Sequence, residues 1–539
     1  MNSSTIRRFA LPTIIVLGVL LRIYWFCCNP SLWIDEAAVA NSIVKYSAGQ
    51  LCVKPLDNAQ MAPVGFLLVE KLFGSLGNYS ESSLRLFSLL SGIAALVMFW
   101  RLARQLCDGL PLVFAVALFS FSGPLIYHSS EVKQYETEVL AAVVILWLVV
   151  RLRDGLTAKQ ALAAGVAAAI CVWFAFSSIF VIAGALATLW VCFLSKKEWQ
   201  NVARIAGIVG LALASFVAYY IFIIRPSANL AVQQSAYEGH FAPWPVSLRA
   251  LLWYARTGYL ALGDPFGVSL DVNLPFLPHS ATLKYLATLS YPAIALCGIG
   301  VYQFWKDNRT LGCLLGSPLV LALVASLLGK YPLLERHFLF FVPSFCLLLA
   351  KAVEAMAVEA KAWPGKRQLI SRALVVWTLL YVVVNLGAKV ARPALFGGMK
   401  HSTMREAIRY INEHYQKGDE VYILWNAVPF YTYYGYRYDL NWSPQISGDP
   451  RIGAHSLDEI RARVKHDVQA GVAGHARTWF LMEEVYSLIN YTDEKGVTHD
   501  IETPTADLYQ EVLSTDDKGK IPAKFIGHGA AAYLVVNEK

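Results

Sequence analysis

Charged residues are scarce in this sequence. Only 16% of its 539 residues are Asp, Glu, Lys or Arg, whereas 56% are hydrophobic, and the mean hydropathy is +0.46. A typical soluble domain carries about 25% charged residues. The shortage therefore argues against an ordinary soluble protein and indicates a polytopic membrane protein.

Several motifs are also missing. The nine cysteines lie chiefly in or beside apolar runs, none beyond position 346, so the spacing shows no disulfide framework or Cys/His metal site. We find no P-loop, nucleotide-binding glycine fingerprint or HExxH zinc pattern. An enzyme of this sequence would need an activated donor delivered through the membrane. The net charge of +8 sits mostly in short loops, which reflects topology rather than nucleic-acid binding.

Long apolar runs recur along the first 391 residues. Windows of roughly 19 residues predict about eleven membrane spans: 10–28, 84–103, 111–127, 138–150, 161–176, 178–194, 204–224, 285–304, 311–328, 338–352 and 370–391. If the N-terminus is cytoplasmic, loop residues such as Arg101, Arg151 and Lys196 all lie inside, as the positive-inside rule requires. The first run is long and lacks a small-residue cleavage site, which favours a retained span over a signal peptide.

This topology places the unusual polar segments on one side: 29–83, 127–137, 225–283, 329–337 and everything after about 392. In the tail, helix-like stretches at 405–415 and 457–468 alternate with apolar strands at 421–425, 478–482 and 531–536. That alternation predicts a small soluble α/β domain. We expect a transmembrane domain over 1–391 and an extracytoplasmic domain over 392–539.

Asp35 and Glu36 follow the first span directly. Carboxylates close to hydrocarbon are costly unless they face a polar cavity or do chemistry. One interpretation is a general base that takes a proton from an acceptor hydroxyl. The other is structural, with Asp35 as the N-cap of a helix and Glu36 in its first turn. The two interpretations are compatible.

The segment 127–137 is a dense polar cluster between two spans. Helical spacing would place Glu131, Tyr135 and Glu138 on one face, with Lys133 turned toward a neighbour. A solvated hairpin with incidental charges is the alternative. The pair Asp35 and Glu36 on the same side of the membrane makes this alternative less favoured.

Two further outer segments carry basic residues. Arg336, His337 and Lys330 precede a late span and could bind a phosphodiester, or could be interfacial anchors. Segment 225–283 mixes aromatics and charges, and we favour belt residues over a sugar-stacking platform. Its members are Arg225, His240, Trp244, Trp253, Tyr254, Arg256, Tyr259 and Asp264.

The order and sidedness of these features resemble the GT-C superfamily of membrane glycosyltransferases, in the branch of bacterial protein O-mannosyltransferases and lipid A aminoarabinose transferases. The resemblance covers nearly the whole chain. The matching motifs are Trp33-Ile34-Asp35-Glu36, Ala62-Pro63-Val64-Gly65-Phe66, Glu131-Val132-Lys133-Gln134-Tyr135, Glu335-Arg336-His337 and Pro429-Phe430-Tyr431-Thr432-Tyr433-Tyr434.

The resemblance implies an inverting transfer of a sugar from a polyprenyl-phosphate donor to an acceptor hydroxyl, in a bacterial inner membrane. It implies that Asp35 is the catalytic base, with Glu36 beside it and Glu131 as a second acidic residue. Lys133, Tyr135, Arg336 and His337 would be the phosphate partners, with Lys330 and Arg256 as further basic residues of the same outer face.

Other questions stay open from the sequence. A polytopic transporter or lipid flippase is the main alternative, because charges within membrane segments also mark transport pathways, and a non-catalytic scaffold is a second one. The acceptor could be protein, lipid or polysaccharide. A divalent metal could assist the acidic residues, whereas a Lys- and Arg-based phosphate site could make a metal unnecessary.

Overall fold

The computed structural model describes residues 9–225, 237, 239–272, 274, 277–278, 280–362, 366–397, 400–484, 488–493, 498–515 and 519–537. Residues 226–236 of the predicted outer segment 225–283 therefore lie outside the described part. The chain divides into two compact units. The first comprises Met1–Cys28 and Tyr46–Phe396, and the second comprises Asn29–Lys45 and Gly397–Lys539.

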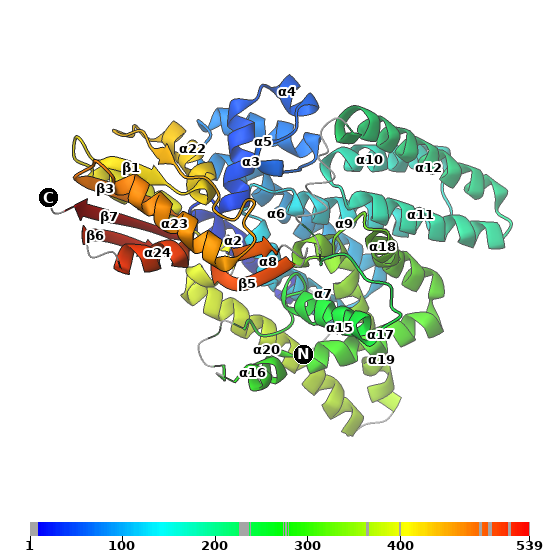
Figure 1. Ribbon diagram of the computed structural model, residues 1–539. Coiled ribbons are helices and arrows are strands. Elements are labelled where there is room, and N and C mark those ends of the chain that lie inside the picture. The colour runs from blue at the N-terminus through cyan, green and yellow to red at the C-terminus, as the bar shows by residue number, and fades with distance from the viewer. Residues whose placement is uncertain are drawn as a thin grey trace. The chain divides into compact units, whose positions relative to one another are not determined.

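The first unit is helical, and its helices are drawn from blue to yellow-green in Figure 1. They are α2 (Leu11–Cys28), α4 (Ala48–Val53), η2 (Asp57–Ala59), α5 (Val64–Leu76), α6 (Glu81–Leu106), α7 (Gly109–Phe121), α8 (Gly123–His128), α9 (Tyr135–Leu152), α10 (Ala158–Phe174), α11 (Ser178–Ser195), α12 (Trp199–Tyr219), η3 (Tyr220–Ile224), α15 (Leu248–Gly263), α16 (Ala281–Thr288), α17 (Tyr291–Asp307), α18 (Arg309–Leu327), η4 (Glu335–Phe341), α19 (Val342–Ala362), α20 (Lys366–Ala391) and η5 (Pro393–Leu395). Each predicted span coincides with one of these helices or with an adjoining pair.

Seven helical segments of the described chain are long and apolar enough to cross a membrane. They are Leu11–Cys28, Glu81–Leu106, Ser178–Ser195, Trp199–Ile224, Arg309–Leu327, Glu335–Val358 and Gln368–Ala391. The pair α16 and α17, bent by 48°, would be an eighth. Helices α7 and α10 are apolar but shorter. A polytopic helical membrane protein is confirmed, while the number of spans stays a prediction.

The second unit contains a five-stranded sheet of order β2-β1-β3-β7-β6. Strand β1 (Glu420–Ile423) pairs in parallel with β2 (Gln445–Ile446) and with β3 (Arg477–Met482). Strand β7 (Ala530–Asn537) runs antiparallel to β3 and to β6 (Gly519–Gly527). A separate hairpin joins β4 (Leu488–Thr492) to β5 (Thr498–Pro504). The predicted α/β architecture of the tail is confirmed.

Helices cover both faces of this sheet. Phe480 and Met482 of β3 pack with α23 (Leu457–Val472) and α24 (Thr505–Thr515), which Figure 1 shows in orange and red. Trp479, one residue along the strand, points to the other face, where its ring meets Tyr410 of α21 (Met404–His414). The alternation along β3 is what two buried faces require of a strand.

Residues 29–45 belong to the second unit, although the sequence analysis grouped them with the membrane spans. Their helix α3 (Ile34–Lys45) packs against α22 (Val428–Arg437). The buried Asn41 side chain donates to the carbonyl of Pro429 over 2.8 Å. The sequence could not reveal this grouping, because it depends on a pairing of segments nearly 400 residues apart.

Asp419 offers a stability test of the second unit. Its buried carboxylate accepts from Arg477 Nε over 2.6 Å and from Trp479 Nε1 over 3.0 Å. Asp419→Ala should lower the free energy of unfolding by about 2 kcal/mol, because hydrogen bonds to a charged acceptor are lost in a buried site. We expect hydrogen exchange of the β1 and β3 amides in the full-length protein to become about 30-fold faster. Asp458→Asn, at a side chain 94% exposed, is the control; unchanged protection in Asp419→Ala would contradict the account.

Candidate active site

Asp35 and Glu36 lie in the first turn of α3. The amide of Ala37 donates to the carbonyl of Trp33 over 2.9 Å, so Trp33 is the residue that precedes the helix. The prediction that Asp35 is the N-cap is therefore wrong. Glu36, only 2% exposed, accepts from the Trp33 amide over 3.2 Å, which is half of a capping box. Glu36 thus fixes the helix start, while the partly exposed Asp35 extends from the first turn.

A turn at residues 129–134 separates α8 from α9. Glu131 lies in this turn, so the helical spacing expected for Glu131, Tyr135 and Glu138 is wrong. The carboxylate of Glu131 lies 2.5 Å from Nδ1 of His128, and both side chains are fully buried. Ser88 Oγ on α6 donates to the carbonyl of Glu131 over 2.7 Å. The turn is therefore held from both sides by polar contacts.

Lys133 is a buried cation on the same turn. Its side chain is 4% exposed, and Nζ donates to Oε1 of Gln60 over 2.5 Å. Gln60 comes from the first outer segment, 73 residues earlier. An ammonium group held away from water interacts strongly with an anion, because screening there is weak. Lys133 is thus suited to bind a phosphate.

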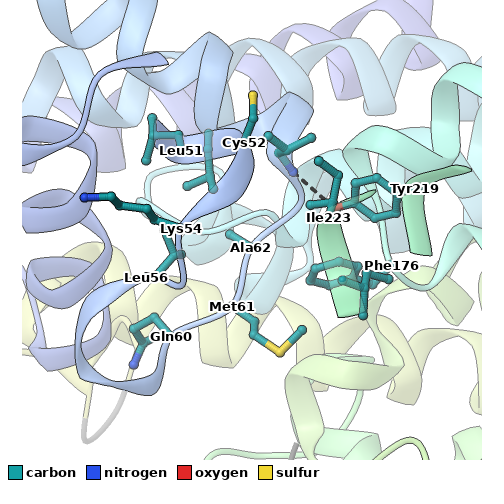
Figure 2. A pocket seen from close by; sticks show the side chains of 13 residues that line it. Leu51, Cys52, Lys54, Leu56, Gln60, Met61, Ala62, Phe176, Tyr219 and Ile223 are labelled. Carbon is teal, nitrogen blue, oxygen red and sulfur yellow. Dashed lines mark hydrogen bonds between the residues drawn. The ribbon is translucent and has the colours of Figure 1, made fainter. Parts of the chain in front are cut away.

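An apolar pocket adjoins Gln60 (Figure 2). It holds about 400 Å³ of space not filled by atoms, part of it open to solvent. Figure 2 shows Phe176, Tyr219 and Ile223 on one side of the pocket, with Lys54 and Gln60 pointing away from them. The dashed line is the 3.1 Å bond from the Val64 amide to the Tyr219 hydroxyl. The lining residues are Leu51, Cys52, Lys54, Leu56, Gln60, Met61, Ala62, Val64, Leu67, Phe176, Tyr219, Ile223 and Ile224.

Two acids near the start of α9 are buried. Glu136 is fully buried, and neither of its carboxyl oxygens has a hydrogen-bond partner among the described residues. Arg22 is also fully buried, and it donates to the carbonyl of Ser120 over 3.1 Å. Glu138 accepts from Ser177 Oγ over 2.7 Å. This contact helps to fix α9 relative to its neighbours, and with it the turn that carries Lys133.

The loop before η4 lies beside α9. The Tyr331 hydroxyl donates to the carbonyl of His337 over 2.9 Å, with ring centres 5.5 Å apart. Burial raises the pKa of Tyr331 well above its usual value, and the negative charge of Glu138 adds to the effect. The phenol of Tyr331 therefore stays neutral. The helix η4 packs against α9. This arrangement brings the predicted Arg336 and His337 to the same region of the unit as Tyr135.

His240 is a further ionisable group in this region. Its carbonyl accepts from the Leu333 amide over 2.8 Å, which joins it to the segment before η4. The pKa of His240 is lowered, first by burial and then by the positive charges of Arg336 and Arg256. Arg256 on α15 and Lys330 are exposed. His240, Arg336 and Arg256 thus lie in one neighbourhood of the described first unit.

The structure brings together some predicted site residues and not others. Within the first unit, Glu131, Lys133 and Tyr135 share one turn and helix start, and η4 with Arg336 and His337 packs on that helix. Asp35 and Glu36 belong to the second unit. Sequence reasoning missed the supporting residues Ser88, His128, Gln60 and Arg22. The three-residue spacing of His128 and Glu131 was the one available signal.

The described residues contain no group of three or more His, Cys, Asp or Glu side chains that could hold a metal ion. Glu131 contacts His128, and Glu138 accepts from Ser177. The role of a divalent metal, left open by the sequence, stays open.

Comparisons with known proteins place the fold. No family model matches the sequence, and no curated protein matches it. Among solved structures, ArnT from Cupriavidus metallidurans bound to undecaprenyl phosphate aligns with a TM-score of 0.51 at 12% identity, over 96% of this chain and 97% of that one. Its apo state gives 0.51 at 11% identity over the same shares. The oligosaccharyltransferase of Archaeoglobus fulgidus, tethered with an acceptor peptide, gives 0.47 at 11% identity, over 93% of this chain and 75% of that one.

The chain therefore has the fold of ArnT over nearly the whole length of both chains, and the resemblance drawn from the sequence motifs is confirmed at the level of the fold. With identities of 11–12%, these alignments leave the role of each residue as a prediction.

The buried pair of His128 and Glu131 gives a stability test. His128→Leu should lower the free energy of unfolding by about 2 kcal/mol, because the buried carboxylate loses its imidazole partner. Adding Glu131→Leu should recover part of that loss, since a buried pair replaced by apolar groups is tolerated better than a broken pair. Unfolding midpoints of the detergent-solubilised single and double variants measure both effects. A double variant that loses the plain sum of the two single effects would contradict the pairing.

Proposed function

We propose that this protein is an inverting glycosyltransferase, which moves a sugar from a polyprenyl-phosphate donor to an acceptor hydroxyl on the extracytoplasmic face of the membrane. The observation that carries the proposal is the buried ammonium of Lys133, on a turn fixed by the paired His128 and Glu131. The GT-C fold supports it, because ArnT, which shares that fold, is described with bound undecaprenyl phosphate.

The phosphate end of the donor is assigned to the basic residues of the first unit. As the bond between the anomeric carbon and the phosphate oxygen lengthens, negative charge grows on the departing phosphate. Lys133, Arg336 and His337 would stabilise that charge, and groups fixed in place before the reaction need no reorganisation while it proceeds. Arg336 supplies a planar fork of donors and Lys133 a compact charge. Tyr135, Lys330 and Arg256 are the outer members of this phosphate site.

The acceptor end is assigned to Asp35. Its carboxylate would take the proton of the acceptor hydroxyl while that oxygen attacks the anomeric carbon. A bond forms between the acceptor oxygen and the anomeric carbon, while the bond from that carbon to the phosphate oxygen breaks on the opposite face. The anomeric centre therefore inverts, and no covalent glycosyl-enzyme forms. Glu36 holds the helix start through the Trp33 amide, and Glu131 supplies a second negative charge beside Lys133. The proposal requires Asp35 and the phosphate site to act on one donor molecule.

A lipid transporter is the alternative function, and the bent pair α16 and α17 is a feature that transporters also show. Purified protein should release labelled sugar from a polyprenyl-phosphate donor and attach it to an acceptor preparation from the cell envelope. Movement of intact donor across sealed vesicles without sugar release would favour the transporter.

Replacement of the proposed base should stop the reaction. Asp35→Asn should reduce transfer of labelled sugar to background, because an amide cannot accept the hydroxyl proton, while the amount of folded protein and the affinity for undecaprenyl phosphate stay close to wild type. Asp154→Asn is the matched control, at a side chain 84% exposed. Full turnover by Asp35→Asn would remove Asp35 from the mechanism.

Replacement of the proposed phosphate partners should weaken donor binding instead. Lys133→Met and Arg336→Gln should each raise the Kd for undecaprenyl phosphate about 10- to 100-fold, because a charge-assisted hydrogen bond contributes roughly 1.5–3 kcal/mol. Binding is measured by calorimetry or scintillation proximity on the solubilised protein. The exposed Lys159→Gln serves as the control. If both variants bind as tightly as wild type, the phosphate lies elsewhere.

A further inference from the structure

The segment that carries Asp35 is tied to the C-terminal residues of its own unit. Asn29, the first residue after α2, has a φ of 39°, in the left-handed region where Asn often ends a helix. Its carbonyl accepts from Nη2 of Arg405 over 3.1 Å. The chain is thus held at the point where it leaves the first span, by a residue 376 positions later.

The next contact is made by Ser31. Its hydroxyl donates to Oε2 of Glu406 over 2.6 Å and accepts from the Arg405 amide over 3.2 Å. Arg405 Nη2 in turn lies 2.8 Å from Oε1 of Glu406. Burial alone would raise the pKa of Glu406, but the Ser31 hydrogen bond and the Arg405 charge lower it below its usual value. The carboxylate is therefore ionised at neutral pH and accepts from both neighbours.

A third contact reaches the residue before Trp33. The amide of Leu32 donates to the hydroxyl of Tyr434 over 2.9 Å, and both residues are fully buried. Tyr434 lies on α22, whose Pro429 carbonyl also accepts from Asn41 at the other end of α3. The helix that begins with Asp35 is thus fixed before its first turn and again near its end.

We propose that the C-terminal domain positions the catalytic carboxylate, with Ser31, Glu406 and Tyr434 as positioning residues for Asp35. This inference rests on the function proposed above. A general base must lie within hydrogen-bond reach of the proton it removes, and a misplacement of about 1 Å can reduce the rate about 100-fold. Asp35 follows Ser31 and Leu32 closely in the chain, at the start of α3, so a shift of those contacts would redirect its carboxylate. The phosphate-binding residues belong to the other unit, so donor affinity should not depend on these contacts.

The test separates turnover from binding. Tyr434→Phe removes a single oxygen atom, Ser31→Ala removes one hydroxyl and Glu406→Gln removes one charge. We expect kcat for labelled-sugar transfer to fall about tenfold or more in each variant, with the Kd for undecaprenyl phosphate within twofold of wild type. Tyr436→Phe on α22 and Glu413→Gln on α21, both at exposed residues of the same helices, should keep the wild-type kcat.

The outcomes distinguish this inference from the proposed function. If Asp35→Asn is inactive while all three positioning variants turn over at the wild-type rate, the inference is wrong and the function stands. A parallel loss of kcat and of undecaprenyl phosphate binding in the positioning variants would also overturn it, since the effect would then be global. If wild-type protein transfers no sugar, or Asp35→Asn retains full activity, the proposed function itself fails.

Discussion

A buried charge in an apolar helix bundle must find a partner, and this constraint organises the first unit. Its acids and bases are few, yet those near the start of α9 are almost entirely enclosed. The Glu131 carboxylate lies beside the His128 imidazole, and Lys133 donates to Gln60 of the first outer segment. The bond to Gln60 joins two segments 73 residues apart, and the bond from Ser88 to the Glu131 carbonyl holds the same turn to α6. These contacts fix the turn from which the phosphate chemistry is proposed to operate.

The two ends of the proposed reaction are supported by different physical means. The proposed phosphate site would depend on electrostatics, because a lysine and an arginine in a poorly screened interior act strongly on an anion. The base depends on geometry, because a carboxylate at a helix start works only if the helix is held in place. The hydrogen bonds from Ser31, Leu32 and Asn41 to the C-terminal residues supply that geometry. In the proposed mechanism, the C-terminal residues thus position the base without contributing a reacting group themselves.

The sequence predicted much of the fold and less of the site. Long apolar runs predict helices directly, and the predicted strands 478–482 and 531–536 agree closely with β3 and β7. The strand β2 was missed because its two residues are too few to show a periodicity. The helix α22 was missed because an aromatic run such as Tyr433-Tyr434 fits a helix or a strand equally well. The prediction that Asp35 is the N-cap was wrong by two positions. The residue before the helix is Trp33, whose carbonyl accepts from the Ala37 amide, and composition does not reveal such a backbone hydrogen bond. Partners such as Gln60 for Lys133 lie too far apart in the chain to be paired from the sequence.

The central claim is that one donor molecule meets the buried cations at its phosphate and Asp35 at its sugar. The most direct measurement is an experimental density map of the full-length protein with a non-hydrolysable analogue of a polyprenyl-phosphate sugar bound. The account predicts phosphate oxygens within hydrogen-bond distance of Lys133 and of Arg336 or His337, with the Asp35 carboxylate directed at the face of the anomeric carbon opposite the phosphate. A phosphate bound away from these cations, or an Asp35 side chain directed into bulk solvent, would contradict it.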